Sequence, residues 1–313
     1  MSFTSIHFLI FFGILIILYY ALPKKIQWIV LLVASYTFYL LNGLQYLAFI
    51  LFTTITTYLV TRYMSGNQTF QTAYLKEHKS EMSKEEKKAF KRVVKSRNRL
   101  WFILTIVANF GILFFCKACL VDPLHSITGS GVITFLSVGL PFGISFYMFQ
   151  SMGYVIDVYR EKAEALRNPF KTALFTAFFP QLVQGPISKF DQLKDSLFSE
   201  HKFDRTQVAF GLERMLWGFF KKMVIADRIA VAVGALNTVE NRGVAFFVMV
   251  IFYSIQLYAD FSGGIDIAIG AAQTLGITLP ENFIRPFFST NIADYWRRWH
   301  ISLSRWLRDY LYI

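Results

Sequence analysis

Long apolar stretches separated by short polar breaks make up the first part of the chain. Residues 5–22, 26–41, 44–64 and 100–121 are four such stretches. A helix needs about 20 apolar residues to cross the hydrocarbon core of a bilayer, so the pattern predicts membrane-spanning helices. We expect the first to be a retained span with its N-terminus outside, because no Lys or Arg precedes it and no small-residue cleavage site follows it.

From residue 132 onward the apolar stretches are interrupted and contain polar residues. The interruptions are Pro141 and Gly143 in 132–158, Pro180 and Pro186 near the end of 171–187, and Gly263 and Gly264 after 243–262. The polar residues are Asp157, Asp227, Arg228, Gln256, Asp260 and Asp266. Irregular backbone at membrane depth is tolerated only in the protein interior or beside a wet cavity, and ionisable residues there mark functional sites. We therefore expect broken or re-entrant helices and the functional site in this half.

Composition agrees with a lipid environment. Hydrophobic residues make up 55% of the 313 residues and charged residues 17%, with a mean hydropathy of +0.43, whereas soluble domains carry about 25% charged residues. Two cysteines cannot form a disulfide framework or a four-cysteine metal site. An ordinary soluble domain, a disordered chain and a disulfide scaffold are excluded, and the expected fold is an all-α, multi-pass transmembrane protein.

Half of the net charge of +12 lies in residues 65–99. This segment is net +6, and its spacing is helical with polar residues on every side, so it is not a span. A nucleic-acid site would need stacking aromatics among the cations, and only Tyr74 and Phe90 are present. The positive-inside rule instead predicts a cytoplasmic loop that rests on anionic lipid headgroups. The cation-free residues 122–131 are predicted to form an external loop.

Residues 292–313, IADYWRRWHISLSRWLRDYLYI, have an amphipathic helical pattern. At 100° per residue, His300 falls on an apolar face with Trp296 and Trp299. The opposite face holds the cations Arg297, Arg298, Arg305 and Arg308. The pattern predicts one continuous helix with a histidine on its buried side.

Two interpretations of His300 stay open on spacing alone. Either it is a core histidine whose ring binds a backbone carbonyl or a hydroxyl such as that of Ser304, or it is a neutral imidazole that burial keeps deprotonated and that takes a proton from an alcohol. The chain also stops at Ile313 with no capping residue or polar tail, so we expect it to be a fragment of a longer protein.

Five motifs occur in an order seen in one family. They are PFGISFYMFQSMGYVIDVYR (141–160), FFPQLVQGPISKFDQL (178–193), FFKKMVIADRIA (219–230), YADFSGGIDIAIGAAQTLGITLPENFIRPF (258–287) and DYWRRWHISLSRWLRDYLYI (294–313). On these motifs the chain resembles the membrane-bound O-acyltransferases, in particular the bacterial type that acts in alginate O-acetylation. The resemblance is close over residues 135–313 and loose before them.

The resemblance implies an enzyme that moves an acyl group from a thioester to a hydroxyl, with broken or re-entrant helices around a central tunnel. It implies one domain of this type over residues 1–313, with spans in 1–64, the basic loop at 65–99 and the catalytic core region from residue 100 onward. Two histidines mark the family. His300 matches the first, and the second lies in a downstream Trp-His motif that this chain does not reach.

On this resemblance His300 is the expected catalytic residue, which orients or deprotonates the acceptor hydroxyl. Asp260 and Asp266 either set the tautomer of an imidazole and hold cavity water, or cap broken helices. Further supporting residues are Trp296, Trp299 and Ser304. The chemistry requires no metal and no bound cofactor, and the acyl thioester, such as acetyl-CoA or an acyl-carrier protein, is a co-substrate.

The resemblance also implies a location and partners. The expected location is the bacterial cytoplasmic (inner) membrane. The expected partners are the lipid bilayer, a polysaccharide acceptor and an extracytoplasmic acetylation protein, with no nucleic acid.

Other motifs give weaker indications. Cys116 and Cys119 have C-x-x-C spacing but lie in an apolar run, which favours small buried hydrophobes over a redox site. The other four histidines lack metal-ligand spacing. Alternatives to acetyl transfer are D-alanyl transfer to teichoic acid, an inactive fragment, and a transporter or lipid-linked-sugar translocase. The sequence has no internal repeat, which weighs against transport.

Overall fold

The computed structural model describes residues 1–118, 141, 143–237 and 243–312. The regular elements in these ranges are helices, and no strand occurs among them, which confirms the predicted all-α fold class. The chain forms two compact units by its contacts. Unit 1 comprises Met1–Ala34, Phe178–Ser188 and Gln192–Ile313, and unit 2 comprises Ser35–Ala177 and Lys189–Asp191.

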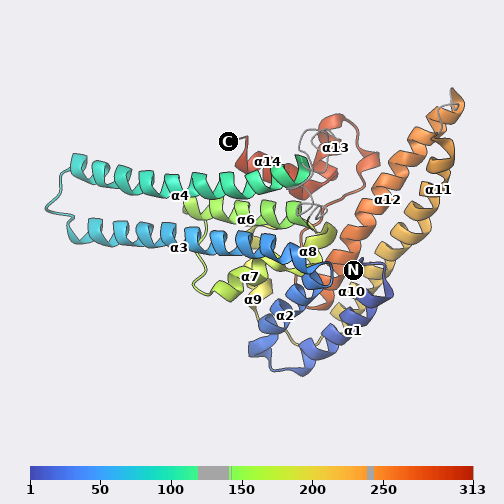
Figure 1. The fold of residues 1–313 in the computed structure, drawn as a ribbon, viewed down its shortest axis with the longest axis horizontal. Coiled ribbons are helices and arrows are strands. Elements are labelled where there is room, and N and C mark those ends of the chain that lie inside the picture. Colours follow the sequence, from blue (N-terminus) through green and yellow to red (C-terminus); the bar gives the residue numbers. More distant parts are fainter. Residues whose placement is uncertain (119–140, 142, 238–242, 313) are drawn as a thin grey trace, which may run out of the picture. The chain divides into compact units, whose positions relative to one another are not determined.

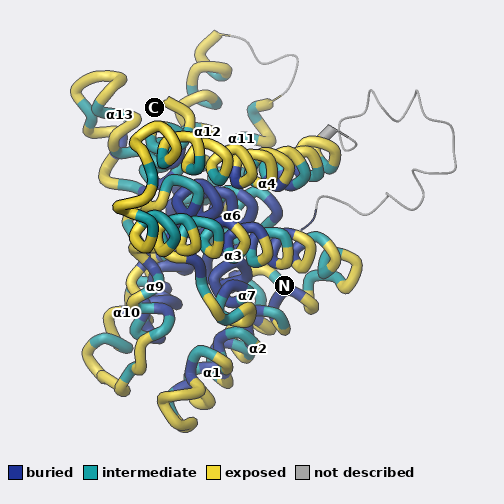
Figure 2. The backbone as a smooth tube through the Cα atoms, turned by 90° about the vertical axis from the view of Figure 1, so that its left-hand side faces the viewer, coloured by how far each residue is buried: buried dark blue, intermediate teal, exposed yellow. Residues whose placement is uncertain are grey.

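Two long helices form the framework of unit 2. α3 (Leu47–Glu77) and α4 (Lys84–Ala118) run side by side, and α6 (Ile144–Tyr159) lies along both (Figure 1). Twelve of the sixteen residues of α6 are buried, so this helix is the core of the unit (Figure 2). α7 (Pro169–Ala177) packs against α3 and α6.

The basic segment at 65–99 has the helical structure that its spacing indicates. α3 continues to Glu77 and α4 begins at Lys84, so the segment is helical apart from a short turn between them. Ser83 and Glu86 form a capping box at the start of α4: the Ser83 hydroxyl accepts from the Glu86 N–H at 3.2 Å, and the Glu86 carboxylate accepts from the Ser83 N–H at 2.8 Å. A helix longer than the bilayer is thick continues into water, where polar residues on every face are solvated.

Unit 1 contains two long helical segments that pack against each other. α10 (Arg205–Phe219), a π-helical turn (Phe220–Ala226) and α11 (Asp227–Leu236) follow one another and lie along α12 (Val244–Thr274) (Figure 1). α12 is unbroken, so the predicted interruption at Gly263 and Gly264 is wrong. Gly263 instead allows close approach: a Cβ on Gly218 of α10 would lie only 2.7 Å from the Gly263 carbonyl oxygen.

The remaining elements are short. They are α1 (Ile6–Ala21), α2 (Gln27–Leu40), α8 (Phe179–Gln184), α9 (Phe190–Phe198), α13 (Ile292–Arg298), α14 (Ile301–Tyr310) and the 3₁₀ turns Lys24–Ile26, Leu44–Tyr46 and Pro286–Phe288.

The predicted breaks near Pro180 and Gly143 are confirmed. α8 is a six-residue helix with Pro180 in its first turn and Gly185 at its end. The Gln181 amide donates to the Pro186 carbonyl and to the Ser188 hydroxyl, both at 2.7 Å, and so holds the turn that follows. α6 begins after Gly143, whose φ is 67°. Cys116 lies in α4, whereas Cys119, residues 132–140 and the predicted external loop at 122–131 lie outside the described residues.

Within the described part of the chain, three segments are long and apolar enough to cross a membrane: Leu44–Glu77, Lys84–Lys117 and Val244–Thr274. Large hydrophobic side chains on them face outward, among them Leu59, Val107 and Phe247, which are 58%, 62% and 66% exposed. Exposed apolar surface on this scale is unfavourable in water and favourable in lipid. The fold is therefore that of a membrane protein.

Candidate active site

His300 lies at a break between two short helices. α13 ends at Arg298, Trp299 is extended, and His300 has φ 45° and ψ 53° before α14 begins at Ile301. The predicted continuous helix over 292–313 is therefore wrong. Left-handed backbone costs a non-glycine residue about 1 kcal/mol or more, and at His300 surrounding contacts must hold it.

Asn282 supplies those contacts. Its carbonyl oxygen accepts from the Ile301 N–H at 3.0 Å, and its side-chain Oδ1 accepts from the Ser302 N–H at 2.9 Å. Two first-turn donors of α14, which have no partner within the helix, are satisfied in this way. A helical wheel cannot detect the break, because the apolar periodicity of 292–313 is the same on either side of it.

The same asparagine contacts the imidazole. Nδ1 of His300 lies 3.2 Å from Nδ2 and 3.3 Å from Oδ1 of Asn282, whose side chain is fully buried. Because Oδ1 accepts from Ser302, the orientation of the amide is set by a donor that cannot reverse. The ring of His300 is therefore held through Nδ1, and Nε2 is the nitrogen on its other side.

Aromatic rings cover the histidine. Phe261 meets the His300 ring edge to face, with centroids 4.9 Å apart and planes at 89°. Phe283 packs on Phe261 and on Trp299, which also stacks on Tyr295. Burial in this environment lowers the pKa of His300 to about 4. The imidazole is therefore neutral at pH 7, which is the state that a general base requires.

The other residues predicted near His300 have different positions. Trp299 packs within the aromatic cluster, whereas Trp296 is 54% exposed, which contradicts a buried apolar face running through both. Ser304 donates its backbone N–H to the His300 carbonyl at 3.1 Å. The Ser304 hydroxyl is the predicted partner of the His300 ring, but the ring contacts Asn282 instead.

A cavity of about 290 Å³ is lined in part by Phe283, which packs on Trp299. Its walls carry charge and aromatic surface, from Arg214, Trp217, Lys221, Tyr258, Ser262, Asp266, Glu281 and Arg285 among others. Tyr258 and Phe283 belong both to this wall and to the aromatic cluster around Trp299. The cavity and the histidine site are thus joined by shared side chains.

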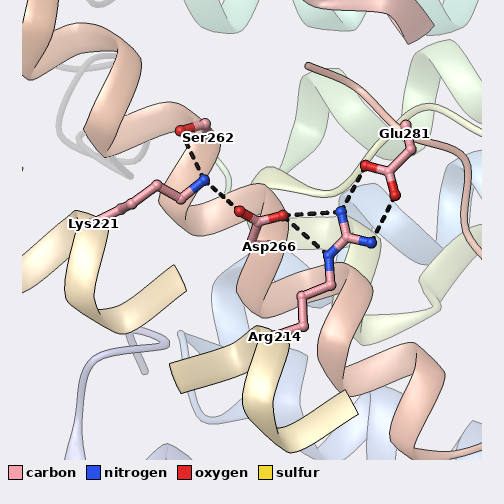
Figure 3. Close-up of polar contacts among 5 residues, drawn as sticks. All are labelled: Arg214, Lys221, Ser262, Asp266 and Glu281. Atoms are coloured by element: carbon pink, nitrogen blue, oxygen red, sulfur yellow. Dashed lines mark hydrogen bonds and ion pairs between the residues drawn. The ribbon is translucent and has the colours of Figure 1, made fainter. Parts of the chain in front are cut away.

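Five residues of the cavity wall form a network of ion pairs and hydrogen bonds (Figure 3). Arg214 binds Asp266 through Nε and Nη2 at 3.1 and 2.9 Å and binds Glu281 through Nη1 and Nη2, both at 2.6 Å. Lys221 donates to Asp266 and, at 3.0 Å, to the Ser262 hydroxyl. The lysine side chain is 10% exposed and that of Asp266 15% exposed, so both charges are largely desolvated and need each other.

Asp260 and Asp266 do not cap helices. Both lie within the unbroken α12 and bind lysines of the π-helical turn, Asp260 binding Lys222 and Asp266 binding Lys221. Lys222 also lies 3.8 Å from Asp227. A π-helical turn widens the helix by one residue, and such turns are frequent at functional sites. It is here the element that presents both lysines to α12.

Sequence reasoning misses four residues of this region. Arg214, Lys221 and Glu281 are distant in sequence from Asp266, and Asn282 is an inconspicuous residue 18 positions before His300. One signal for the lysines is available: Lys221 and Lys222 interrupt an apolar run, FFKKMVIA, where an unpaired cation would be costly. Their carboxylate partners cannot be read from that signal.

Residues 31–313 match the model of the MBOAT, membrane-bound O-acyltransferase family. The chain belongs to this family.

Curated relatives agree. The chain is 35% identical to "Probable alginate O-acetylase AlgI" of Pseudomonas syringae pv. tomato, over all of this chain and 57% of the relative. It is 36% identical to the Azotobacter vinelandii protein of the same name, over all of this chain and 59% of that protein. Identity to the peptidoglycan O-acetyltransferase of Helicobacter pylori is 37%, over 69% of this chain and 46% of the relative. The chain thus spans about half the length of the curated relatives that it matches.

Proposed function

We propose that this protein is an O-acyltransferase that moves an acetyl group from a thioester to hydroxyl groups of an extracytoplasmic polysaccharide. Membership of the family and the names of its relatives support the reaction class. The observation in the structure that supports it most is the half-buried His300, which is neutral at pH 7 and held at a helix break by Asn282.

The reaction joins two substrates without a covalent enzyme intermediate. The acceptor hydroxyl oxygen attacks the thioester carbonyl carbon, a C–O bond forms, and the C–S bond breaks when the tetrahedral intermediate collapses. Nε2 of His300 takes the hydroxyl proton as the oxygen attacks, and the same proton returns to the leaving thiolate. The products are an O-acyl ester and a free thiol, so atoms and protons balance.

In this proposal Asn282 sets the tautomer. For Nε2 to accept a proton, Nδ1 must carry the ring hydrogen, and Oδ1 of Asn282 at 3.3 Å is the acceptor that fits it. Oδ1 has two lone pairs and accepts from Ser302 with the other. Phe261 supports the step by keeping water from one side of the imidazole ring.

The donor, location and partners belong to the same proposal. The donor is an acyl thioester such as acetyl-CoA or an acyl-carrier protein, and the protein crosses the bacterial cytoplasmic membrane several times. Residues 1–313 act as one domain of the family, with an extracytoplasmic acetylation protein as partner. Trp299 supports the site by packing, and Asp260 and Asp266 support it by holding the π-helical turn against α12.

A cell assay tests the proposal. Cells that lack the native enzyme would carry this chain, a chimera that continues after Ile313 with the downstream part of the Azotobacter vinelandii relative, or the His300→Ala form of either. Membrane levels would be equalised by blot, and ester-linked acetate on surface polysaccharide would be measured after mild alkaline release. We expect acetate from at least one form with His300 and none from its His300→Ala counterpart. Acetate from no form, or ester-linked D-alanine in its place, would overturn the proposal.

A further inference from the structure

A second cavity, of about 430 Å³, lies in unit 2 where α6 ends. It is a half-open cavity bordered by the hairpin of α3 and α4 and by the last residues of α6, beyond which the two long helices continue (Figure 1). Its lining is polar and basic, with Gln68 and Gln71 from α3, Lys91 and Lys95 from α4, and Arg160 after α6. The site described above is in unit 1 and uses none of these residues.

The cavity is built from fixed side chains. Gln68 donates its amide to the Val158 carbonyl at 3.1 Å, which ties α3 to the end of α6. Asn98 is 4% exposed and accepts from the Asn67 amide at 2.8 Å, which ties α4 to α3. Tyr159 stacks on Phe102, with centroids 4.4 Å apart. The walls are therefore held before any ligand arrives.

The charge of the lining favours an anion. Lys91, Lys95 and Arg160 contribute three positive charges and Glu161 one negative charge, so the lining is net +2. Lys91 and Lys95 are four residues apart on one face of α4, and their side chains are exposed to the cavity rather than buried. A phosphate group with one or two negative charges matches this arrangement.

The depth of the cavity favours a lipid. Gln68 is four residues beyond the end of the apolar stretch 44–64, about 6 Å along the helix axis, and Lys95 is five residues before the apolar stretch 100–121, about 7 Å. The headgroup layer extends about 5 to 8 Å beyond the hydrocarbon core on each side. Gln68 and Lys95 are thus at the level where phospholipid phosphates lie, and Lys91 is one helical turn, about 6 Å, further out along the helix axis.

We propose that this cavity binds the phosphate of an anionic phospholipid headgroup, with Lys91, Lys95 and Arg160 as its cationic ligands. Basic pockets between membrane helices recognise such headgroups. The bound lipid would fill the gap between the α3–α4 hairpin and the end of α6. The proposal is independent of acyl transfer, so either can fail without the other.

The test measures lipid binding by the purified chain in a neutral detergent at 150 mM salt. Native mass spectrometry would count bound phosphatidylglycerol as its concentration is raised, with phosphatidylcholine as the neutral comparison. The cavity variant is Lys91→Gln/Lys95→Gln. The matched control is Lys88→Gln/Arg92→Gln, which removes the same charge at the same spacing from exposed residues of the same helix that do not line the cavity.

We expect one phosphatidylglycerol to bind more tightly than phosphatidylcholine. A cation near anionic lipid contributes about a fivefold change in affinity, so the cavity variant should raise the Kd about 25-fold. The control should change it less than about twofold, because a detergent micelle has no anionic surface of its own. Lys91→Arg/Lys95→Arg should retain binding, and a similar loss in both Gln pairs would overturn the proposal.

Competition separates the two sources of phosphate. Inorganic phosphate and coenzyme A would be added to the complex with phosphatidylglycerol. We expect neither to displace the lipid at millimolar concentration. If coenzyme A displaces it and binds the wild type more tightly than the cavity variant, the occupant is a soluble phosphate and the lipid assignment is overturned.

Discussion

Asn282 binds the ring of His300 and the backbone that follows it. The contacts from Asn282 to Nδ1 are 3.2 and 3.3 Å long, and those from the N–H groups of Ile301 and Ser302 are 3.0 and 2.9 Å long. One buried residue thus fixes both the left-handed backbone of the histidine and the orientation of its imidazole. The position of the ring depends on Asn282 more than on any periodicity of the helix.

Replacing Asn282 should therefore lower the rate of acetyl transfer per folded molecule, beyond any loss of folded protein. Asn282→Ala removes the contact to Nδ1 and leaves the Ser302 N–H without its acceptor, which costs about 1 to 3 kcal/mol of stability. A misplaced base typically loses about 100-fold in rate. Initial rates of acetyl transfer at equal folded protein would measure this, and an unchanged rate would show that Asn282 does not position the imidazole.

Asn282→Asp gives a signature that a purely structural role would not. The carboxylate still accepts from Ser302 but adds a negative charge beside the imidazole, which should raise the pKa of His300. The acid limb of the pH–rate profile should then move to higher pH relative to the wild type. An acid limb that stays in place would contradict the assignment of His300 as the titrating base.

The wild-type pH profile follows from the lowered pKa of His300. A free histidine titrates near pH 6.5, but burial lowers the pKa of this one to about 4, so its active neutral form persists between those values. We expect the acid limb of kcat/KM to have a midpoint near pH 4 to 5. The rate measured from pH 4 to 8 in buffers of constant ionic strength tests this, and a midpoint near 6.5 would indicate an exposed histidine.

The same pKa makes a prediction for stability. Because the folded-state pKa is below the unfolded one, the unfolded chain binds the extra proton first as the pH falls. His300 should therefore cost no stability above about pH 6.5 and destabilise the fold progressively down to about pH 4. Thermal unfolding of wild type and His300→Gln should diverge over that range, with the variant losing less stability on acidification.

Asp266 should contribute more to stability than Asp260. The side chain of Asp266 is 15% exposed and binds both Lys221 and Arg214, whereas that of Asp260 is 33% exposed and binds Lys222. Removing one partner of a buried pair costs about 3 to 5 kcal/mol, against about 0 to 1 for an exposed pair. The apparent Tm in detergent should fall by several degrees more for Asp266→Asn than for Asp260→Asn, and equal shifts would contradict the network.

The contact between α10 and α12 predicts a contrast between two glycines. Gly218→Ala places a methyl group 2.7 Å from the Gly263 carbonyl oxygen and from Ile267, so the helices must separate, which costs about 1 to 3 kcal/mol. Gly234→Ala on α11 meets nothing within 4 Å and gains helix propensity. The first variant should lower the apparent Tm and the second leave it equal or higher. The reverse order would contradict the packing.

Much of the fold can be predicted from the sequence because it depends on local composition. Apolar length predicts the helices of the first half, and Pro180 and Gly143 predict breaks that local backbone chemistry imposes. The sequence wrongly predicts a helix break at Gly263 and Gly264. Glycine signals either flexibility or close approach, and only the partner, here Gly218, decides between them.

The candidate site is less predictable because its contacts are distant in sequence. The periodicity of 292–313 places His300 on an apolar side but cannot show the break that Asn282 creates. Asp266 is recognisable as a costly ionisable residue, yet Arg214 and Lys221 reach it from a helix some 50 residues away. A single sequence indicates that a buried charge needs a partner, but it does not identify the residue that is the partner.

The most direct test of the account is the rate of acetyl transfer with and without His300. Membranes bearing whichever form acetylates polysaccharide in cells would receive acetyl-labelled thioester and acceptor, and labelled ester would be counted over time. His300→Ala should lower the rate by about 100- to 10,000-fold at unchanged membrane level, while His7→Ala, at an exposed histidine, should leave it unchanged. Wild-type rates in the His300→Ala form would contradict the central claim.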